Sequence, residues 1–158
     1  MAITYSLELG TSQPAAPMAA ELCEVGRILG LFDQAVTADS ILGDGAVTAH
    51  GTWIRVFTAH PRPWNAVIVD LGFTPTVTMM FRLDKSTDIS AQLDDVISLV
   101  SGLLDRVPGD AVLHFDYEYI MLLRRNGDLS LNERSDIWPP QRLAAVQQPY
   151  HRATHAFS

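Results

Sequence analysis

The sequence predicts an α+β fold in two layers, a mainly antiparallel sheet of five to six strands with two helices packed on one face. Segments with an apolar residue at every second position, typical of half-buried strands, alternate with two longer segments that have the three- and four-residue apolar spacing of amphipathic helices. The length of 158 residues fits one domain. We therefore expect a single α+β domain over residues 1–143 and a C-terminal tail over 144–158.

The first strand and the first helix are predicted near the N-terminus. In ITYSLEL the apolar residues fall at alternate positions starting from Ile3, as in a strand with one buried face. The segment 14–32 has helical apolar spacing, with prolines at its start and Gly30 near its end. Residues 33–51 lack a sustained period, so we expect a loop there with one short strand around Val47.

The middle of the chain predicts two further strands and the second helix. TWIRVFT alternates and ends at the two prolines of AHPRPW, which prevent regular pairing. NAVIVDLGF fits a short strand or an extended loop, whereas TPTVTMMFRLD alternates clearly. The helical segment after Leu83 begins at the capping residues Ser86, Thr87 and Asp88 and ends before Pro108.

The C-terminal third predicts a polar strand face and a hairpin. In AVLHFDYEYIMLLRR the residues His114, Asp116 and Glu118 alternate with apolar residues, so we expect one strand that carries all three on one side. The Asn-Gly pair that follows is the strongest short hairpin signal. The proline-punctuated end should wrap the body or fray, with one possible helical turn around Leu143.

Composition restricts the classes of function. The formal charge of −7 repels phosphate backbones, so we expect no nucleic-acid partner. Solubility accounts for this charge, which also favours a basic protein partner. Cys23 is the only cysteine, which leaves no internal disulfide and favours a buried apolar role. No signal peptide or membrane-spanning segment is evident, so we expect a cytoplasmic protein with no membrane contact and no cofactor.

If the helices cover one face of the sheet, the alternate residues of each strand point to the other face. Aromatic, arginine and carboxylate side chains mixed in this way are typical of a recognition surface. The predicted partner-binding residues are Trp53, Arg55, Phe57, Arg82, His114, Asp116 and Glu118.

Three alternatives remain open for this face. His114, Asp116 and Glu118 offer metal ligands, which would suit a small metal-dependent hydrolase. The same row fits an ordinary solvated strand face, cross-paired with Arg82 or Arg55. A homodimeric interaction domain without catalytic activity would bury this face against a second copy.

The segments GTWIRV, GFTPTVTMMFRLDK, LVSGLLDRVPGDAVLHF, LLRRNGDLSLNE and DIWPPQRL resemble, in order and spacing, a family of bacterial immunity proteins. This is the third SitI family, the Sit-type immunity proteins of swarming-inhibition systems. The resemblance implies that the chain binds and neutralises a cognate bacterial toxin in interbacterial competition and is not an enzyme. It supplies no catalytic residues and no metal ligands.

Overall fold

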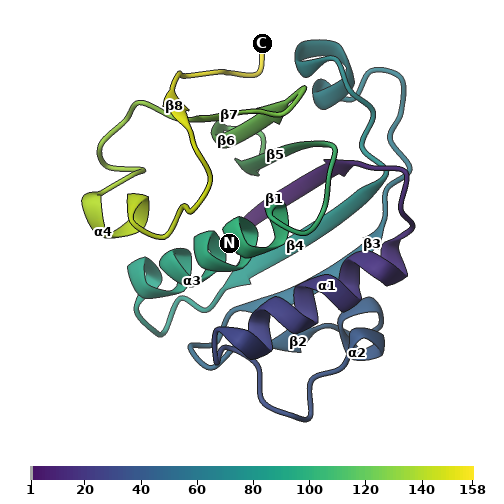
Figure 1. Ribbon diagram of the computed structural model, residues 1–158, viewed down its shortest axis with the longest axis vertical. Helices are drawn as coiled ribbons and strands as arrows, with labels where there is room; N and C mark the ends of the chain where they lie inside the picture. Colours follow the sequence, from purple (N-terminus) through teal and green to yellow (C-terminus); the bar gives the residue numbers. More distant parts are fainter. Residues whose placement is uncertain (1) are drawn as a thin grey trace.

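The N-terminal strand lies in the interior of the sheet. The computed structural model describes residues 2–158. The strands are β1 (Ile3–Gly10), β2 (Ala46–Val47), β3 (Trp53–Thr58), β4 (Val77–Leu83), β5 (Asp110–Phe115), β6 (Tyr119–Arg125), β7 (Asp128–Leu131) and β8 (His151–Arg152). They form one eight-stranded sheet in the order β2-β3-β4-β1-β5-β6-β7-β8 (Figure 1). The β7–β8 pair is parallel, and the other pairs are antiparallel.

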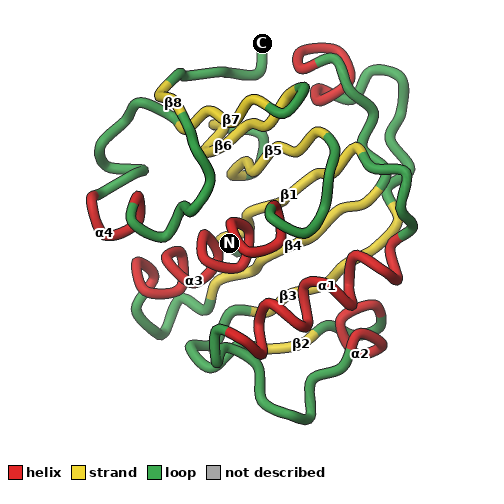
Figure 2. The backbone as a smooth tube through the Cα atoms, in the orientation of Figure 1, coloured by secondary structure: helices red, strands yellow, loops and turns green. Residues whose placement is uncertain are grey.

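Two long helices, α1 (Ala15–Ile28) and α3 (Ile89–Leu104), lie on one face of the sheet, as the sequence predicted (Figure 2). The shorter elements are α2 (Ala38–Leu42), the π-helical turn η1 (Val67–Leu71) and α4 (Pro140–Leu143). The expectation of five to six strands and two helices was therefore too low for the described residues. Strands of two residues and helices of four or five are too short to show a period in the sequence.

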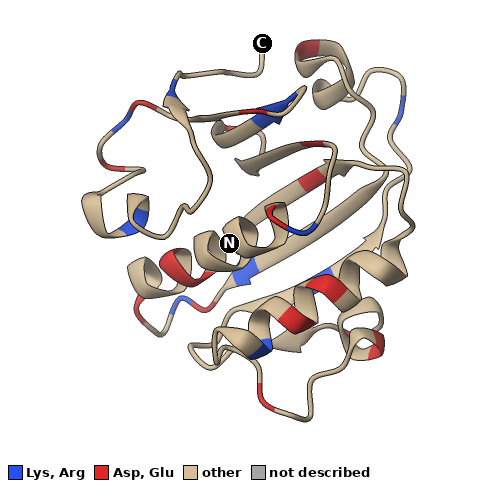
Figure 3. Ribbon diagram, viewed as in Figure 1, with Lys and Arg blue, Asp and Glu red and all other residues tan. Residues whose placement is uncertain are grey.

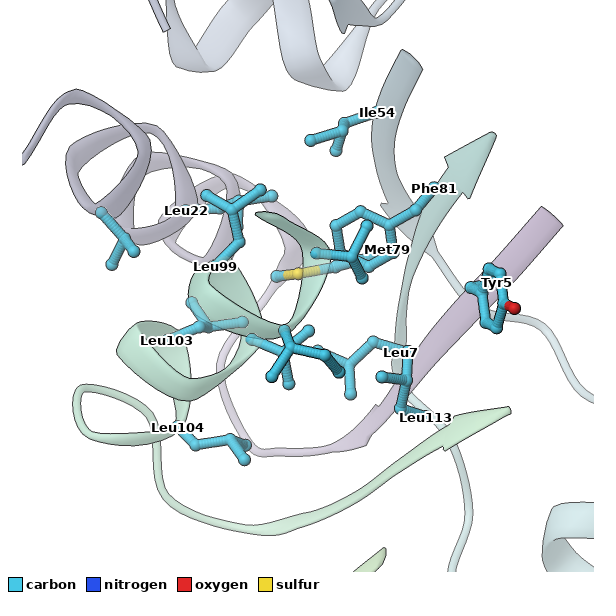
Figure 4. Packing of buried hydrophobic residues seen from close by; sticks show 14 of the residues in the cluster. Tyr5, Leu7, Leu22, Ile54, Met79, Phe81, Leu99, Leu103, Leu104 and Leu113 are labelled. Atoms are coloured by element: carbon cyan, nitrogen blue, oxygen red, sulfur yellow. The ribbon is translucent and has the colours of Figure 1, made fainter. Parts of the chain in front are cut away.

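The core between the helices and the sheet consists of the predicted apolar positions. Leu7 and Phe81 from adjacent central strands pack toward Leu22 on α1 and Leu103 on α3 (Figure 4). All four side chains are fully buried, and each such burial stabilises the fold by about 1.5–3 kcal/mol. Cys23 also lies in this core, as expected for a buried apolar residue.

The helix ends follow from capping chemistry. The carboxylate of Asp88 accepts a hydrogen bond from the backbone N–H of Ala91 (3.1 Å) and so caps α3. The chain leaves α1 just before Gly30, whose φ of 71° is readily adopted by glycine. The predicted start and end of both helices are therefore close to those observed.

The segment from Asp110 to Arg125 is a hairpin, and the prediction of a single strand was wrong. β5 ends at Phe115, three residues form a turn, and β6 begins at Tyr119. Asp116 and Tyr117 have left-handed backbones, with φ of 47° and 59°. The turn contains no glycine or proline, so its alternating polar residues look like a continuing strand in the sequence.

The less regular segments give mixed outcomes. The strand expected around Val47 is β2, but the helix α2 precedes it and was not predicted. The segment NAVIVDLGF forms neither a strand nor an extended loop; it contains η1. The predicted hairpin turn at Asn126-Gly127 is confirmed by φ values of 52° and 81°, which match a type I′ turn.

The face of the sheet opposite α1 and α3, the second face, is covered over β5 and β6. Val112, Ile120 and Leu123 point to this side and pack with Val67 of η1 and with Phe73 in a small second core. Leu71 and Phe157 pack against it. The second face therefore has a covered half over β5 and β6 and an open half over β3 and β4.

The tail wraps the body. Val146 belongs to the main core, and β8 pairs with β7. Near the C-terminus, the Ser158 hydroxyl donates to Asp70 beside η1 (2.6 Å). The helical turn predicted around Leu143 is α4. None of the helices formed by residues 2–158 has the length and apolarity needed to cross a membrane.

Candidate functional site

Four of the predicted partner-binding residues lie together on the open half of the second face. Trp53, Arg55 and Phe57 occupy alternate positions of β3. Arg82 of the neighbouring strand β4 lies opposite Trp53. The guanidinium carbon of Arg82 lies 4.8 Å from the centre of the Trp53 ring, and that of Arg55 lies 5.5 Å from the centre of the Phe57 ring. Stacking of this kind contributes about 0.5–1 kcal/mol at an exposed site and holds the arginines in place.

The loop before β2 reaches these residues from the edge of the sheet. The indole N–H of Trp53 donates to the carbonyl oxygen of Asp44 (3.0 Å), and the Nε–H of Arg55 donates to that of Gly43 (2.9 Å). Trp53 is half-buried by this arrangement, whereas Arg55 and Arg82 remain exposed. The loop therefore orients the aromatic and cationic groups without covering them.

A pocket of ≈ 490 Å³ separates the open half from the covered half. Its floor is formed by alternate residues of β1 and β4, including Glu8 and Thr78, which pair in register. One wall is the segment from Ala59 to Asn65, and the other is the turn after β5. We call it the Glu8 pocket, because this glutamate is the buried acidic residue in its lining.

Glu8 is 5 % exposed and is held by side chains from three other parts of the chain. The Thr78 hydroxyl donates to one carboxylate oxygen (2.7 Å), and the Tyr117 hydroxyl donates to the other (3.1 Å). The Nε2 atom of His114 lies 3.5 Å from that second oxygen. The carboxylate is thus surrounded by hydrogen-bond donors.

This surrounding sets the protonation of Glu8 and Tyr117. Burial acts to raise the pKa of Glu8, but the nearby His114 ring and the hydrogen bonds from the Thr78 and Tyr117 hydroxyls outweigh it, so the pKa lies below its ordinary value. Burial, together with the nearby Glu8 charge, raises the pKa of Tyr117 to about 12. At neutral pH, Glu8 is therefore an anion and Tyr117 a neutral donor.

His114 has a defined tautomer. Its Nδ1 accepts a hydrogen bond from the backbone N–H of Tyr117 (3.1 Å), so Nδ1 carries no proton. The proton of the neutral ring is then on Nε2, which has no hydrogen-bond partner among the described residues. The ring is 1 % exposed and lies under Phe157, with ring centres 5.6 Å apart.

The turn separates Asp116 and Glu118 from the row in which they were expected. Both are exposed in the turn, and Asp116 lines the Glu8 pocket. Within residues 2–158 no three His, Cys, Asp or Glu side chains are placed to hold a metal ion together. His114, Asp116 and Glu118 thus do not form the metal-ligand row on which the hydrolase alternative depended.

Comparison with known proteins decides the family. The SitI3-like family profile matches residues 3–142. The chain belongs to the SitI3-like family of Sit-type immunity proteins. No curated protein and no solved structure matches it significantly.

The part of the chain that matches the SitI3-like family contains every strand and side chain of the Glu8 pocket named above. Phe157, which covers His114, lies outside the matched residues. Acidic and basic residues of this SitI3-like protein are interspersed along the ribbon, and α1 carries both signs (Figure 3).

Sequence reasoning missed three residues of this site in the SitI3-like protein. Glu8 is a polar residue of the first predicted strand, and the sequence did not mark it as a buried anion, because its hydrogen-bond donors come from distant segments. Tyr117 falls at an apolar position of the single strand that was expected there, but the turn directs its hydroxyl to Glu8. Trp64 was passed over within AHPRPW, although it is 75 % exposed. A tryptophan directly after two closely spaced prolines was the available signal.

Proposed function

We propose that this SitI3-like protein binds and neutralises a cognate bacterial toxin through the open half of its second face. Family membership over residues 3–142 carries the proposal. Neutralisation by binding needs no catalytic group and no cofactor, and we propose that it takes place in the cytoplasm of the cell that the protein protects.

The composition of the open half supports its use as the interface. Binding hot spots are enriched in tryptophan and arginine and require side chains that are already ordered. Trp53 and Arg82 are ordered by their mutual stacking, and Arg55 by its bond to Gly43. These groups lose little further freedom when a partner binds.

The far side of the pocket extends the same surface. Trp64 projects from the wall opposite the turn that carries Asp116 and Glu118. The two carboxylates would meet basic groups on the toxin and favour rapid association. The interface would then run from Trp53 across the Glu8 pocket to Trp64.

A competition assay tests the function. A native strain that lacks the gene is mixed with its parent, and survival is counted with and without a plasmid-borne copy. We expect the deletion strain to be killed and the wild-type copy to restore survival. Survival of the deletion strain without the plasmid, under conditions in which the parent kills unrelated competitors, would refute immunity.

A pair of variants tests the location. Trp53→Ala combined with Asp116→Asn removes an anchor and a charge, and asparagine tolerates the left-handed backbone at this position. The matched control combines Ile28→Ala with Glu24→Gln on the exposed surface of α1. We expect the first variant to lose protection and toxin binding and the control to keep both. Loss by both variants, or by neither, would place the interface elsewhere.

A further inference from the structure

Among the described residues, no Lys or Arg forms an ion pair with the buried Glu8 carboxylate. Buried charges in proteins are normally paired, because removal of an ion from water costs several kcal/mol. The groups that contact this carboxylate are the Thr78 and Tyr117 hydroxyls and the His114 ring. Two of these are neutral hydroxyls, so the charge state of His114 decides whether Glu8 has a counter-charge.

The imidazole of His114 is neutral in this arrangement. A protonated ring has a hydrogen on both nitrogens, and Nδ1 then cannot accept from the Tyr117 backbone N–H, which lies 3.1 Å away. Nδ1 does accept there, so the ring is uncharged. The negative charge of Glu8 is consequently dispersed by neutral donors and is not cancelled.

The arginine in the pocket lining is too far away to cancel it. Arg82 stacks on Trp53, at the level of Thr4 on β1, whereas Glu8 pairs with Thr78. Four residues along a strand separate the two backbone levels by about 13 Å, and Arg82 is not among the groups that shift the pKa of Glu8. The end of the pocket at Glu8 therefore stays negative.

The pocket beside Glu8 has room for an organic cation. Its volume of ≈ 490 Å³ exceeds what a single metal ion fills, and it offers no cluster of metal ligands among the described residues. The Phe57 ring lines the pocket next to the Thr78 and Glu8 pair, and aromatic faces attract planar guanidinium groups. A carboxylate accepts about four hydrogen bonds, so Glu8 keeps acceptor capacity beyond the two hydroxyls.

We propose that the Glu8 pocket receives the guanidinium group of an arginine side chain presented by the bound toxin. This inference rests on the proposed immunity function and assigns the chemistry of the partner. The guanidinium supplies a counter-charge at Glu8 and stacks against the Phe57 ring, which Arg55 also contacts.

Nuclear magnetic resonance of the intact protein tests the pocket without the toxin. The probe is N-ethylguanidinium chloride, titrated to about 0.1 M while the Tyr117 amide and the His114 ring nitrogens are observed. N-ethylurea serves as the neutral isostere, and tetramethylammonium chloride controls for ionic strength. We expect saturable binding of ethylguanidinium alone, with a dissociation constant of about 1–10 mM. Equal binding of ethylurea, no saturation, or a doubly protonated His114 ring at neutral pH would overturn the inference.

Variants show whether the named groups form the site. Glu8→Gln should weaken binding about tenfold or more, because a charge-assisted bond is lost. Phe57→Leu keeps Glu8 and should weaken it about two- to fivefold. Glu24→Gln removes the same charge from an exposed position on α1, outside the pocket lining, and should leave binding unchanged. If Glu8→Gln fails to fold, Phe57→Leu still decides, because unchanged binding there contradicts the proposed stacking.

The competition assay separates this inference from the proposed function. If the wild-type protein protects and Glu8→Gln protects equally, the toxin does not use the pocket; the inference fails and the immunity function stands. If the wild-type protein gives no protection, the immunity function fails, and with it the assignment of the arginine to a toxin, whatever the titration shows.

Discussion

Arg142 of α4 and Asp94 of α3 form an ion pair whose Nε and Oδ1 atoms are 2.7 Å apart. The Arg142 side chain is 5 % exposed and the Asp94 side chain 33 %. Arg142 also donates to the carbonyl oxygen of Ile137 (2.8 Å) and to the hydroxyl of Ser90 (3.2 Å). One guanidinium therefore fastens the C-terminal segment to the longest helix.

We expect Arg142→Met to lower the free energy of unfolding by about 2–3 kcal/mol, because it removes a partner from each of three acceptors while Asp94 keeps some access to water. Urea denaturation measures the change. Arg134→Met, in an exposed ion pair with Asp136, is the control and should leave the midpoint unchanged. Equal midpoints for wild type and Arg142→Met would show that the pair does not hold the tail.

The lowered pKa of Glu8 predicts a pH dependence of stability. A carboxyl whose pKa is lower in the folded than in the unfolded state contributes stability above its unfolded value and loses it as the pH falls through the folded value. The difference in unfolding free energy between wild type and Glu8→Gln should therefore be constant near neutrality. Below about pH 4.3 the wild type should lose stability relative to Glu8→Gln. Urea denaturation between pH 3 and pH 7 measures this. A difference that does not vary with pH would contradict the assigned hydrogen bonds.

Phe157→Ala should expose His114. The Phe157 ring packs against the rings of both His114 and Tyr117, so its removal opens the covered half of the second face. We expect faster modification of His114 by diethyl pyrocarbonate, read by mass spectrometry, and a stability loss of about 1–2 kcal/mol for the half-buried ring. Phe157→Leu should keep most of the protection. An unchanged rate in Phe157→Ala would mean that other groups shield the ring.

Gly102→Ala should destabilise the protein even though alanine favours helices. A Cβ atom at this position of α3 would lie 2.6 Å from the Cγ1 of Val25 on α1, so the helices would have to separate. Such overpacking costs about 1–3 kcal/mol, against a gain of about 1 kcal/mol in helix propensity. Ser98→Ala, one turn earlier on α3, has only the propensity gain. Thermal denaturation should show a lower midpoint temperature for Gly102→Ala and not for Ser98→Ala.

The elements that the sequence predicted well are those that keep a regular apolar spacing over many residues. β1, β4 and α3 each bury a continuous apolar set, so alternation or helical spacing determines them locally. The capping carboxylate of Asp88 and the Asn126-Gly127 turn add signals that also depend only on neighbouring residues.

The candidate site was less predictable because long-range contacts determine it. Glu8 and Tyr117 are 109 residues apart, and their hydrogen bond depends on a turn whose left-handed residues are not glycines. Once that turn was taken for a strand, Asp116 and Glu118 were assigned to the wrong surroundings. The open half of the second face was closer to expectation, because Trp53, Arg55, Phe57 and Arg82 lie on regular strands.

The interior position of β1 has a consequence for synthesis in the cell. Its neighbours in the sheet are β4, where Ile3 pairs with Leu83, and β5, where Gly10 pairs with Asp110. A growing chain therefore carries this strand unpaired until β4, at Val77–Leu83, has been translated. Native pairs so distant in sequence close slowly, and an unpaired apolar strand can associate with other chains. The helix α1, which follows β1 directly and packs in the same core, is the earliest element that can shield it.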